Sequence, residues 1–428
     1  AETVVPLQPS VPPKNIAAKK SRLRVAVWTI LSLAALGFAI YKFLNPAPVN
    51  FEAKNTTRLT SSGKVKVAAI APDSKFIVYS QEESDGKQSM WMRHIGSGSS
   101  AQIAAPANIE FQGINISPDG NSIYYTSEKG TLYRMPVLGG ERKKIVDDLF
   151  VAPSASQTNV AISPDSRQIG FVRRFEKDKT VLFVADADGA NERTLAAFEQ
   201  PTKIAPAPVW SPNGETIATR IQLEGGDNNI VVVRVADGSN TIALPKNWSV
   251  ILKAVWLLDS KNFLVVGRGD SLSNHIFRVN SLNGEKSRIT DGSNNYEDIS
   301  LSADGRFLAA VRVEQTAHIW TTPREDATRA RQLTAGFGKF DGITSLNWLP
   351  DDKIVYDSMP NGELSTWKIE AGGGNPQQIA KDAGMEAVSP DGSFMVYRKS
   401  FAETGDLGLY RMNLSDGEEK LLTAHSGV

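Results

Sequence analysis

A short turn sequence recurs eight times along this chain, and its spacing constrains the fold more than any other feature. In its fullest form it reads Ser117-Pro118-Asp119-Gly120, and it lies between two apolar strand-like runs. The Asp or Asn of successive copies stands at positions 73, 119, 165, 213, 259, 304, 351 and 391. Steps of 40 to 48 residues between copies are typical of the four-stranded blades of a β-propeller.

The residues around each turn support this interpretation. Proline presets the backbone for the first turn position, Asp bonds to the turn backbone, and Gly tolerates the exit conformation. Large apolar residues stand three places before each Asp or Asn and are predicted to be core: Ile70, Ile116, Ile162, Trp210, Trp256, Leu301, Trp348 and Val388. The residues one place earlier are small, as a crowded innermost strand needs: Ala69, Asn115, Ala161, Val209, Val255, Ser300, Asn347 and Ala387.

Each unit continues with a third strand, a Gly-rich or polar hairpin and a short outer strand. We therefore predict an all-β fold, a β-propeller of four-stranded blades over residues 57–428, with eight blades preferred. One outer strand is in excess, because residues 58–60 match the outer-strand pattern although residues 421–423 already complete the eighth unit. A seven-bladed ring, whose last unit begins a further segment, is the alternative.

The N-terminal part has a different character. Residues 25–44 are apolar and uncharged except for Lys42, and at ~1.5 Å per residue they can span a ~30 Å bilayer core as one α-helix. The bulky end of this run, Tyr41 to Leu44, argues against a cleaved signal peptide. Five basic residues precede the run, so the N-terminus is expected in the cytoplasm and the propeller outside it: Lys14, Lys19, Lys20, Arg22 and Arg24.

The expected organisation is a disordered cytoplasmic linker (1–18), a basic flank with a transmembrane helix (19–44), a linker (45–56) and the propeller. This makes a single-pass protein of the inner (plasma) membrane with a periplasmic or extracellular domain. Because the chain begins at Ala1 and not at a Met, we interpret it as part of a longer protein.

Composition and motifs argue against several functions. The formal net charge is zero, so no nucleic-acid partner is expected, and there are no cysteines for thiol chemistry. No Gly-x-Ser-x-Gly elbow occurs, and the four histidines are scattered without ligand spacing. We therefore predict no catalytic, cofactor-binding or metal-binding residues. Two basic clusters, Arg173-Arg174 and Arg142 to Lys144, are interpreted as solvated loop faces.

The repeat resembles the propeller repeats of TolB and of the N-terminal domain of dipeptidyl peptidase IV, which share Ser-Pro-Asp-Gly before an aliphatic-aromatic strand. The resemblance covers residues 57–423. The membrane helix followed by Thr57 to Lys64, with Leu132 to Gly140 later, is similar to acidobacterial membrane proteins. Those proteins carry a cytoplasmic kinase or winged-helix domain before the helix, and this resemblance implies a signalling role.

Propeller geometry puts a binding face at the mouth of the central channel, near the starts of the innermost strands. The polar residues six to seven places before each turn Asp are the candidates for that face: Lys66, Gln112, Asn159, Lys253, Glu297, Asp298 and Ser345. The function expected is a non-enzymatic, membrane-tethered sensor or scaffold that binds a protein or a small ligand. Two alternatives stay open: the gating propeller of a prolyl-oligopeptidase-type membrane peptidase, and a TolB-like envelope scaffold.

Overall fold

The computed structural model describes Trp28 and residues 55–127, 129–151, 159–176, 179–244, 248–268, 273–290, 294–314, 316–324, 326–336, 339–360, 364–400 and 407–425. The predicted segments 1–18 and 19–44 lie outside these residues, apart from Trp28, which is helical. Among the described residues, no helix has the length and apolar content needed to cross a bilayer. The membrane helix, its orientation and the N-terminal linker therefore stay predictions.

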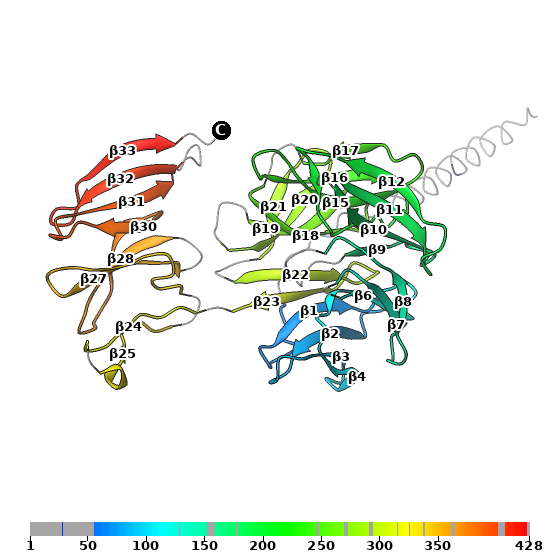
Figure 1. Ribbon diagram of the computed structural model, residues 1–428, viewed down its shortest axis with the longest axis horizontal. Coiled ribbons are helices and arrows are strands. Elements are labelled where there is room, and N and C mark those ends of the chain that lie inside the picture. Colours follow the sequence, from blue (N-terminus) through cyan, green and yellow to red (C-terminus); the bar gives the residue numbers. More distant parts are fainter. Residues whose placement is uncertain are drawn as a thin grey trace, which may run out of the picture. The chain divides into compact units, whose positions relative to one another are not determined.

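From residue 65 onward the described chain is built from antiparallel strands, numbered here as sheets 1 to 8 after the repeat units (Figure 1). Sheet 1 contains β1 (Val65–Ile70), β2 (Phe76–Glu82), β3 (Gln88–His94) and β4 (Ser100–Ala107). Sheet 2 contains β5 (Gln112–Ile116), β6 (Ser122–Thr126), β7 (Leu132–Pro136) and β8 (Lys143–Val146). Sheet 3 contains β9 (Val160–Ile162), β10 (Gln168–Arg174), β11 (Thr180–Asp186) and β12 (Arg193–Phe198).

Sheet 4 has five strands, β13 (Lys203–Ile204), β14 (Val209–Trp210), β15 (Thr216–Gln222), β16 (Asn228–Arg234) and β17 (Asn240–Ile242). Sheet 5 contains β18 (Val250–Trp256), β19 (Asn262–Arg268), β20 (His275–Asn280) and β21 (Lys286–Arg288). Sheet 6 contains only β22 (Asn295–Leu301) and β23 (Leu308–Val313).

Two short strands, β24 (Trp320–Thr321) and β25 (Arg331–Gln332), pair with each other and flank a single turn of 3-10 helix, η2 (Ala327–Arg329). Sheet 7 contains β26 (Leu346–Trp348), β27 (Lys353–Ser358), β28 (Ser365–Glu370) and β29 (Gln377–Lys381). Sheet 8 contains β30 (Ala383–Val388), β31 (Phe394–Ser400), β32 (Leu407–Asn413) and β33 (Glu419–His425). The all-β class and the four-stranded unit are thus confirmed for sheets 1, 2, 3, 5, 7 and 8.

The eight repeated turns join the innermost strand of each sheet to the strand that follows it in sequence, β14 to β15 in sheet 4, as predicted. In sheet 2 the Ser117 hydroxyl donates to Asp119 Oδ1 at 2.5 Å and accepts from Ser122 N at 3.0 Å. Asp119 also accepts from the backbone N of Asn121 at 3.0 Å. The residue after the Asp or Asn has a positive φ in every copy: Ser74, Gly120, Ser166, Gly214, Ser260, Gly305, Asp352 and Gly392. The repeated sequence is therefore a structural turn whose side chains satisfy its own backbone.

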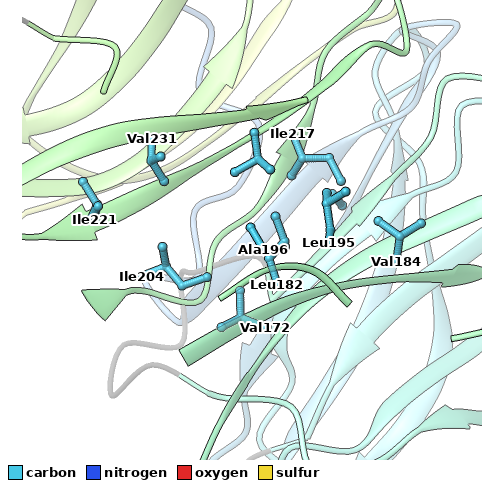
Figure 2. Close-up of a cluster of buried hydrophobic side chains, with 11 residues drawn as sticks. Val172, Leu182, Val184, Leu195, Ala196, Ile204, Ile217, Ile221 and Val231 are labelled. Atoms are coloured by element: carbon cyan, nitrogen blue, oxygen red, sulfur yellow. The ribbon is translucent and has the colours of Figure 1, made fainter. Parts of the chain in front are cut away.

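Buried apolar clusters join neighbouring sheets within the first six. Between sheets 3 and 4, Val172 and Leu182 of sheet 3 pack against Ile217 and Val231 of sheet 4 (Figure 2). Leu182, Ile217 and Val231 are fully buried, and each such side chain contributes about 1.5–3 kcal/mol to folding. Corresponding clusters join sheets 1 and 2, sheets 2 and 3, and sheets 4 and 5.

Sheet 6 packs against both sheet 5 and sheet 1. Ile299 of β22 lies in one cluster with Leu264 of sheet 5, and Val311 of β23 lies in another with Ile70 of sheet 1. The backbone N of Ile70 also donates to Ser300 Oγ at 3.1 Å. Sheets 1 to 6 therefore form a closed cycle. This corrects the expected single ring of eight or seven blades, because the edge of sheet 1 is occupied by the sixth unit and not by a later one.

Strands β24 to β33 form a second packed group. Ile319, just before β24, packs against Ile354 and Tyr356 of sheet 7, while Tyr397 of sheet 8 packs against Val355. The third and fourth strands expected for the sixth unit therefore do not extend sheet 6, since the apolar face of that segment is buried on sheet 7 instead.

Two further expectations differ from the structure. Residues 58–60 do not form a strand, although Leu59 packs on the cluster between sheets 6 and 1. Trp348, predicted to be core, is 59% exposed, whereas the equivalent Trp256 is 7% exposed. The difference arises because sheet 6, the preceding unit, packs on sheet 1 and leaves the β26 side chain uncovered.

The positive φ at the turn exits generates a prediction. Ser74 has φ 62°, and among the described residues its buried hydroxyl has no hydrogen-bond partner. The left-handed conformation costs a residue with a Cβ about 1 kcal/mol, so Ser74→Gly should raise the free energy of unfolding by about 0.5–1 kcal/mol. Chemical denaturation of the two proteins measures this difference.

Ser166→Gly is the matched control. Ser166 has the same positive φ, but its hydroxyl accepts from the backbone N of Asp119 at 3.2 Å, linking two turns. Relief of strain is there offset by a lost hydrogen bond of about 1 kcal/mol, and we expect little net change. Equal gains in both variants would contradict this account of the turns.

Candidate functional site

The seven residues predicted to form a binding face have different surroundings in the structure. Four are buried, namely Gln112, Asn159, Lys253 and Asp298. Lys66 is exposed and pairs with Glu82 at 2.9 Å, and Glu297 and Ser345 are half-buried. The structure brings Lys253 and Asp298 into contact, whereas Ser345 belongs to the second packed group. A binding role for these residues stays a prediction, and the buried ones have clear structural contacts.

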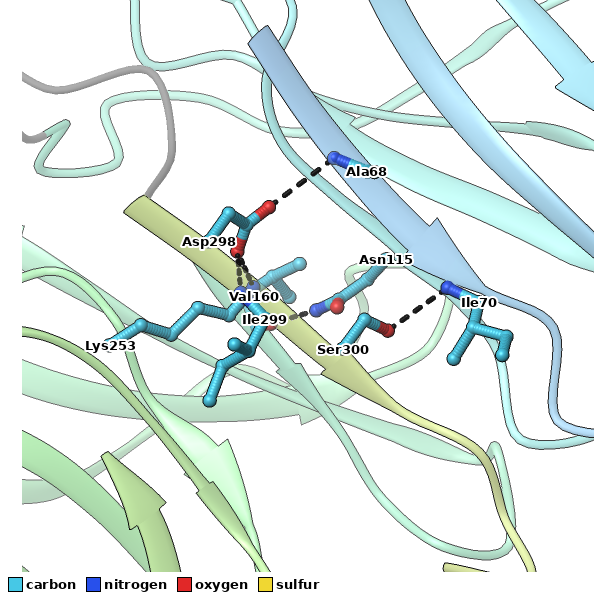
Figure 3. A network of polar contacts seen from close by, with 8 residues as sticks. All are labelled: Ala68, Ile70, Asn115, Val160, Lys253, Asp298, Ile299 and Ser300. Atoms are coloured by element: carbon cyan, nitrogen blue, oxygen red, sulfur yellow. Dashed lines mark hydrogen bonds and ion pairs between the residues drawn. The ribbon is translucent and has the colours of Figure 1, made fainter. Parts of the chain in front are cut away.

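Lys253 and Asp298 form a buried ion pair between sheets 5 and 6. Lys253 Nζ lies 2.5 Å from Asp298 Oδ1, and the two side chains are 5% and 2% exposed. Asp298 also accepts from the backbone N of Ile299 at 2.9 Å and from Ala68 N of sheet 1 at 3.3 Å (Figure 3). One carboxylate therefore links three sheets, and each charged group is compensated in the interior.

Residues at the small positions of the innermost strands make further links between sheets. Asn115 Nδ2 donates to the carbonyl of Val160 at 2.7 Å, joining sheet 2 to sheet 3 (Figure 3). In the second group Asn347 Nδ2 donates to the carbonyl of Glu386 at 3.0 Å, joining sheet 7 to sheet 8. Sequence reasoning classed these residues as small and missed their role. The sequence does hold a sign of this role, because Asn115 and Asn347 occupy the same position in two repeat units.

Gln112 and Asn159 lie on the boundary between sheets 2 and 3. Asn159 Nδ2 donates to Thr126 Oγ1 at 2.6 Å, and Thr126 Oγ1 donates to the carbonyl of Gln112 at 2.8 Å. Among the described residues, the buried Gln112 Oε1 and Asn159 Oδ1 have no hydrogen-bond partner. Both acceptors are thus available to a water molecule or a ligand group at this boundary.

A cleft of about 430 Å³ opens over sheets 3, 4 and 5, within the size range of small-molecule sites. Its walls come from the ends of β10 and β15 and from the starts of β11, β13, β16 and β18. This is the end of the sheets opposite the repeated turns, where the innermost strands begin. We call it the basic cleft, after the lining residues Arg174, Lys203 and Arg220.

The basic cleft has a rigid wall on one side. Strand β13 pairs with β15, so that Lys203 lies opposite Gln222, and Ile204 N donates to Thr180 Oγ1 at 3.0 Å. Ile204 is fully buried in the cluster between sheets 3 and 4. Lys203 is therefore carried by a strand that is fixed on both of its sides.

Three of the described side chains that line the basic cleft are cationic, and each of them has contacts of its own. Arg220 Nη1 donates to the carbonyl of Ile251 at 2.8 Å, while its buried Nε has no partner among the described residues. Burial lowers the pKa of Arg220 from its usual range.

None of the seven predicted residues is among the described residues that line the basic cleft. Arg174, interpreted from sequence as part of a solvated loop face, lines it, and its guanidinium lies 5.5 Å from the centre of the Phe150 ring. Arg174 and Arg220 lie near the ends of β10 and β15, and Lys203 lies on the additional strand β13. Only the packing of sheets 3 to 5 brings them together.

Acidic residues gather in the second group. Asp357 of β27 is fully buried and accepts from the backbone N of Thr344 and of Ser345, both at 3.2 Å. Glu386 of β30 is 4% exposed, and neither of its carboxylate oxygens has a hydrogen-bond partner among the described residues. Burial raises the pKa of Glu386 to about 7, with the Ser345 hydroxyl opposing this shift and the Asp357 carboxylate adding to it.

Within the part of the chain that the structure describes, no group of three metal-ligating side chains lies together. His275 is buried, with 1% of its surface exposed. Its burial lowers its pKa to about 4, so the imidazole is neutral at pH 7. This histidine is accordingly part of the core of sheet 5.

Residues 149–342 match the family described as the TolB beta propeller domain. The match spans sheets 3 to 6 together with β24 and β25, and it confirms the predicted TolB-like repeat over that range. No curated protein matches the sequence.

Solved propeller structures are similar to the chain at low identity. TolB from Acinetobacter baumannii is 15% identical, with 81% of this chain and 79% of that chain covered and a TM-score of 0.35. The β-propeller domain of the Trilobed protease from Pyrococcus furiosus is 15% identical, with 84% and 97% covered and a TM-score of 0.38. The acylaminoacyl peptidase of Pyrococcus horikoshii is 14% identical, with 84% and 52% covered and a TM-score of 0.37. The chain thus spans about half the length of that peptidase. TM-scores of this size carry no information about activity or partners.

The ion pair between sheets 5 and 6 generates a second prediction. Lys253→Met should lower the free energy of unfolding by about 3–5 kcal/mol, because it leaves Asp298 buried without a counter-charge. Adding Asp298→Asn removes that charge and keeps an acceptor for Ala68 N, so the double variant should recover about 2 kcal/mol. Denaturant titration of four proteins, the parent, Lys253→Met, Asp298→Asn and the double variant, measures these differences.

Lys66→Met provides the comparison for Lys253→Met, since it removes a lysine from an exposed ion pair. Exposed pairs contribute under about 1 kcal/mol. If the losses in free energy of unfolding caused by Lys253→Met and by Asp298→Asn add in the double variant, Lys253 and Asp298 do not stabilise each other.

Glu386 generates a prediction about pH. Its pKa in the folded state, about 7, lies above the ordinary value of 4.5, so the folded protein keeps a proton that the unfolded chain releases. Stability should therefore fall as the pH rises from about 4.5 to about 7. Glu386→Gln should remove this loss and be more stable than the parent at pH 8, by up to about 3 kcal/mol.

Unfolding curves of both proteins between pH 5 and pH 8 measure the effect. The difference between the two profiles isolates Glu386 from other titrating groups, including His275, whose lowered pKa has the opposite sign of effect. A constant difference across this range would show that Glu386 ionises normally.

Proposed function

We propose that the cycle of sheets is a non-enzymatic binding domain whose binding site is the basic cleft. The observation that carries the proposal is the cleft itself, a concave surface of about 430 Å³ with cations and apolar side chains in its lining. Sites for small ligands have this size and this mixture of apolar walls and a few polar groups. Loops that such a scaffold holds at the ends of its strands are where binding residues concentrate.

The proposal extends to where the domain works. The apolar run 25–44, preceded by basic residues, supports a single membrane tether with a cytoplasmic N-terminus. The propeller would then face the periplasm or the cell exterior and serve as the sensor or scaffold half of a signalling protein. The TolB-like match over residues 149–342 equally supports an envelope scaffold without a signalling role.

A photo-crosslinking amino acid placed at Gln222 tests the binding role in the full chain. Gln222 lines the basic cleft, so in cells that natively express the protein we expect a discrete adduct on irradiation. The same amino acid at Arg167, which is exposed beside the turn at the other end of β10, is the control. No adduct at Gln222, or equal labelling at both positions, would contradict a binding function for the cleft.

A further inference from the structure

We infer that the end of sheets 1 to 6 that carries the repeated turns, which we call the turn end, rests on the surface of a lipid bilayer. Exposed leucine and phenylalanine side chains of sheets 2, 5 and 6 make the contact. The inference rests on the proposed membrane tether and adds the surface through which the tethered domain meets the membrane.

The hairpins between third and fourth strands lie at the same end of the sheets as the repeated turns. In sheet 2 the backbone N of Val137 donates to the carbonyl of Asn121, just after the turn, at 3.0 Å. In sheet 5 the backbone N of Ser281 donates to the carbonyl of Lys261, in the equivalent place, at 2.9 Å. The turn end is therefore built from the repeated turns and these outer hairpins together.

Four large apolar side chains of the described residues are exposed at the turn end. Leu138 and Leu282, in the outer hairpins of sheets 2 and 5, are 82% and 80% exposed. Leu258, in the repeated turn of sheet 5, and Phe307, just after the turn of sheet 6, are also exposed. Leu258 reaches the turn of sheet 6, since a Cβ placed on Gly305 would lie 3.0 Å from its Cδ1. The apolar side chains of sheets 5 and 6 therefore belong to one surface.

The fold does not require leucine at these positions. Leu138 and Leu282 stand two residues before a Gly of the hairpin, and small residues fill this position in sheets 1, 3 and 4: Gly96, Ala187 and Ala236. Leu258 stands where six other copies of the turn have proline: Pro72, Pro118, Pro164, Pro212, Pro350 and Pro390. Exposed apolar surface that the fold itself does not need is typical of a site that contacts a protein or a membrane.

The two hairpin leucines stand on opposite sides of the cycle. Sheets 1 to 6 pack on one another in chain order and close on themselves, so sheets 2 and 5 are three places apart in either direction. A flat surface touches both hairpins at once, whereas a partner bound at one boundary touches only one of them. A bilayer is such a surface, and its interface takes up leucine and phenylalanine side chains.

The length of chain before the domain favours a bilayer over other flat surfaces. The apolar run proposed as the tether ends at residue 44, and Asn55 is the first residue of the domain that the structure describes. Residues 45–54 lie between them, and even a fully extended chain of this length reaches only about 35 Å. A tether this short keeps the domain at high effective concentration beside the membrane. With the turn end on the bilayer, the basic cleft at the opposite end of the sheets faces away from it.

The charges at the turn end are mixed. Lys261 and Arg306 are exposed in the turns of sheets 5 and 6, whereas Asp188 and Asp237 are exposed in the outer hairpins of sheets 3 and 4. We therefore expect insertion of apolar side chains to drive the contact, and not attraction to anionic lipids. Vesicles of neutral phosphatidylcholine are accordingly the appropriate probe.

Fluorescent labels on single cysteines test the contact in the full chain, reconstituted into phosphatidylcholine vesicles. The chain has no cysteine of its own, so Asn283→Cys and Glu141→Cys each provide one labelling site, beside Leu282 and Leu138 respectively. We expect lipids that carry a spin label near the head group to quench both labels. Ser84→Cys is the control, because Ser84 is exposed in the loop between β2 and β3 at the opposite end of the sheets, and its label should stay unquenched.

Removal of a leucine identifies the side chains that enter the bilayer. Leu282→Ser, made in the chain labelled at position 283, should lower the ratio of docked to undocked domain by about tenfold, because a leucine side chain no longer leaves water. Ile242→Ser is the matched control, since Ile242 is exposed on the outer strand β17 and not in a turn or hairpin, and it should leave the quenching unchanged. Raising the salt concentration should also leave the quenching unchanged, because the contact is apolar.

Several outcomes would overturn the inference: equal quenching of the labels at positions 84 and 283, quenching at only one of the two hairpins, or equal effects of Ile242→Ser and Leu282→Ser. Flotation of the same vesicles separates these results from failure of the proposed tether. A chain that floats with the vesicles while the hairpin labels stay unquenched keeps the tether and rejects the turn end as the contact surface. A chain that does not float rejects both the tether and the inference.

Discussion

A single carboxylate holds together the point at which the cycle of sheets closes. Asp298 pairs with Lys253 of sheet 5 and accepts a hydrogen bond from Ala68 N of sheet 1, while it stands on β22 of sheet 6. A carboxylate buried in this way is tolerated only when charge and hydrogen bonds compensate it from every side. The compensation requires all three sheets at once, so this interaction selects the neighbour of sheet 1 among several sheets with similar apolar faces.

The apolar clusters between sheets explain stability but not specificity. Val172 and Leu182 against Ile217 and Val231 are typical of every boundary, and a face of Val, Leu and Ile accepts many partners of the right volume. The side-chain hydrogen bonds between sheets differ from one boundary to the next. Asn115 to the Val160 carbonyl distinguishes sheets 2 and 3, and Ser300 with Asp298 distinguishes the contact of sheet 6 with sheet 1.

The binding proposal depends on an irregularity in an otherwise repetitive array. Sheet 4 alone, among the described sheets, carries an additional strand, β13, which brings Lys203 to the end of the sheet where Arg174 and Arg220 also lie. A regular repeat would place equivalent residues in different sheets, far from one another. The basic cleft arises where the repeat departs from its pattern, which is where a function can be added without disturbing the scaffold.

Local sequence patterns were enough to predict the local structure. Turn residues at eight positions and strand alternation predicted the all-β class, the first two strands of each unit and the core residues of most units, because these depend on contacts within a few residues of each other. Three features follow from how the sheets pack and from no local pattern: the cycle closes after six sheets, Ile319 packs on sheet 7, and Trp348 is exposed. They depend on which apolar faces meet and on the contacts that Asp298 makes with sheets 5 and 1. Both involve residues that are far apart in the sequence. The basic cleft is a further example, because no local pattern predicts that Arg174, Lys203 and Arg220 lie close together, and only the packing of the sheets makes them neighbours.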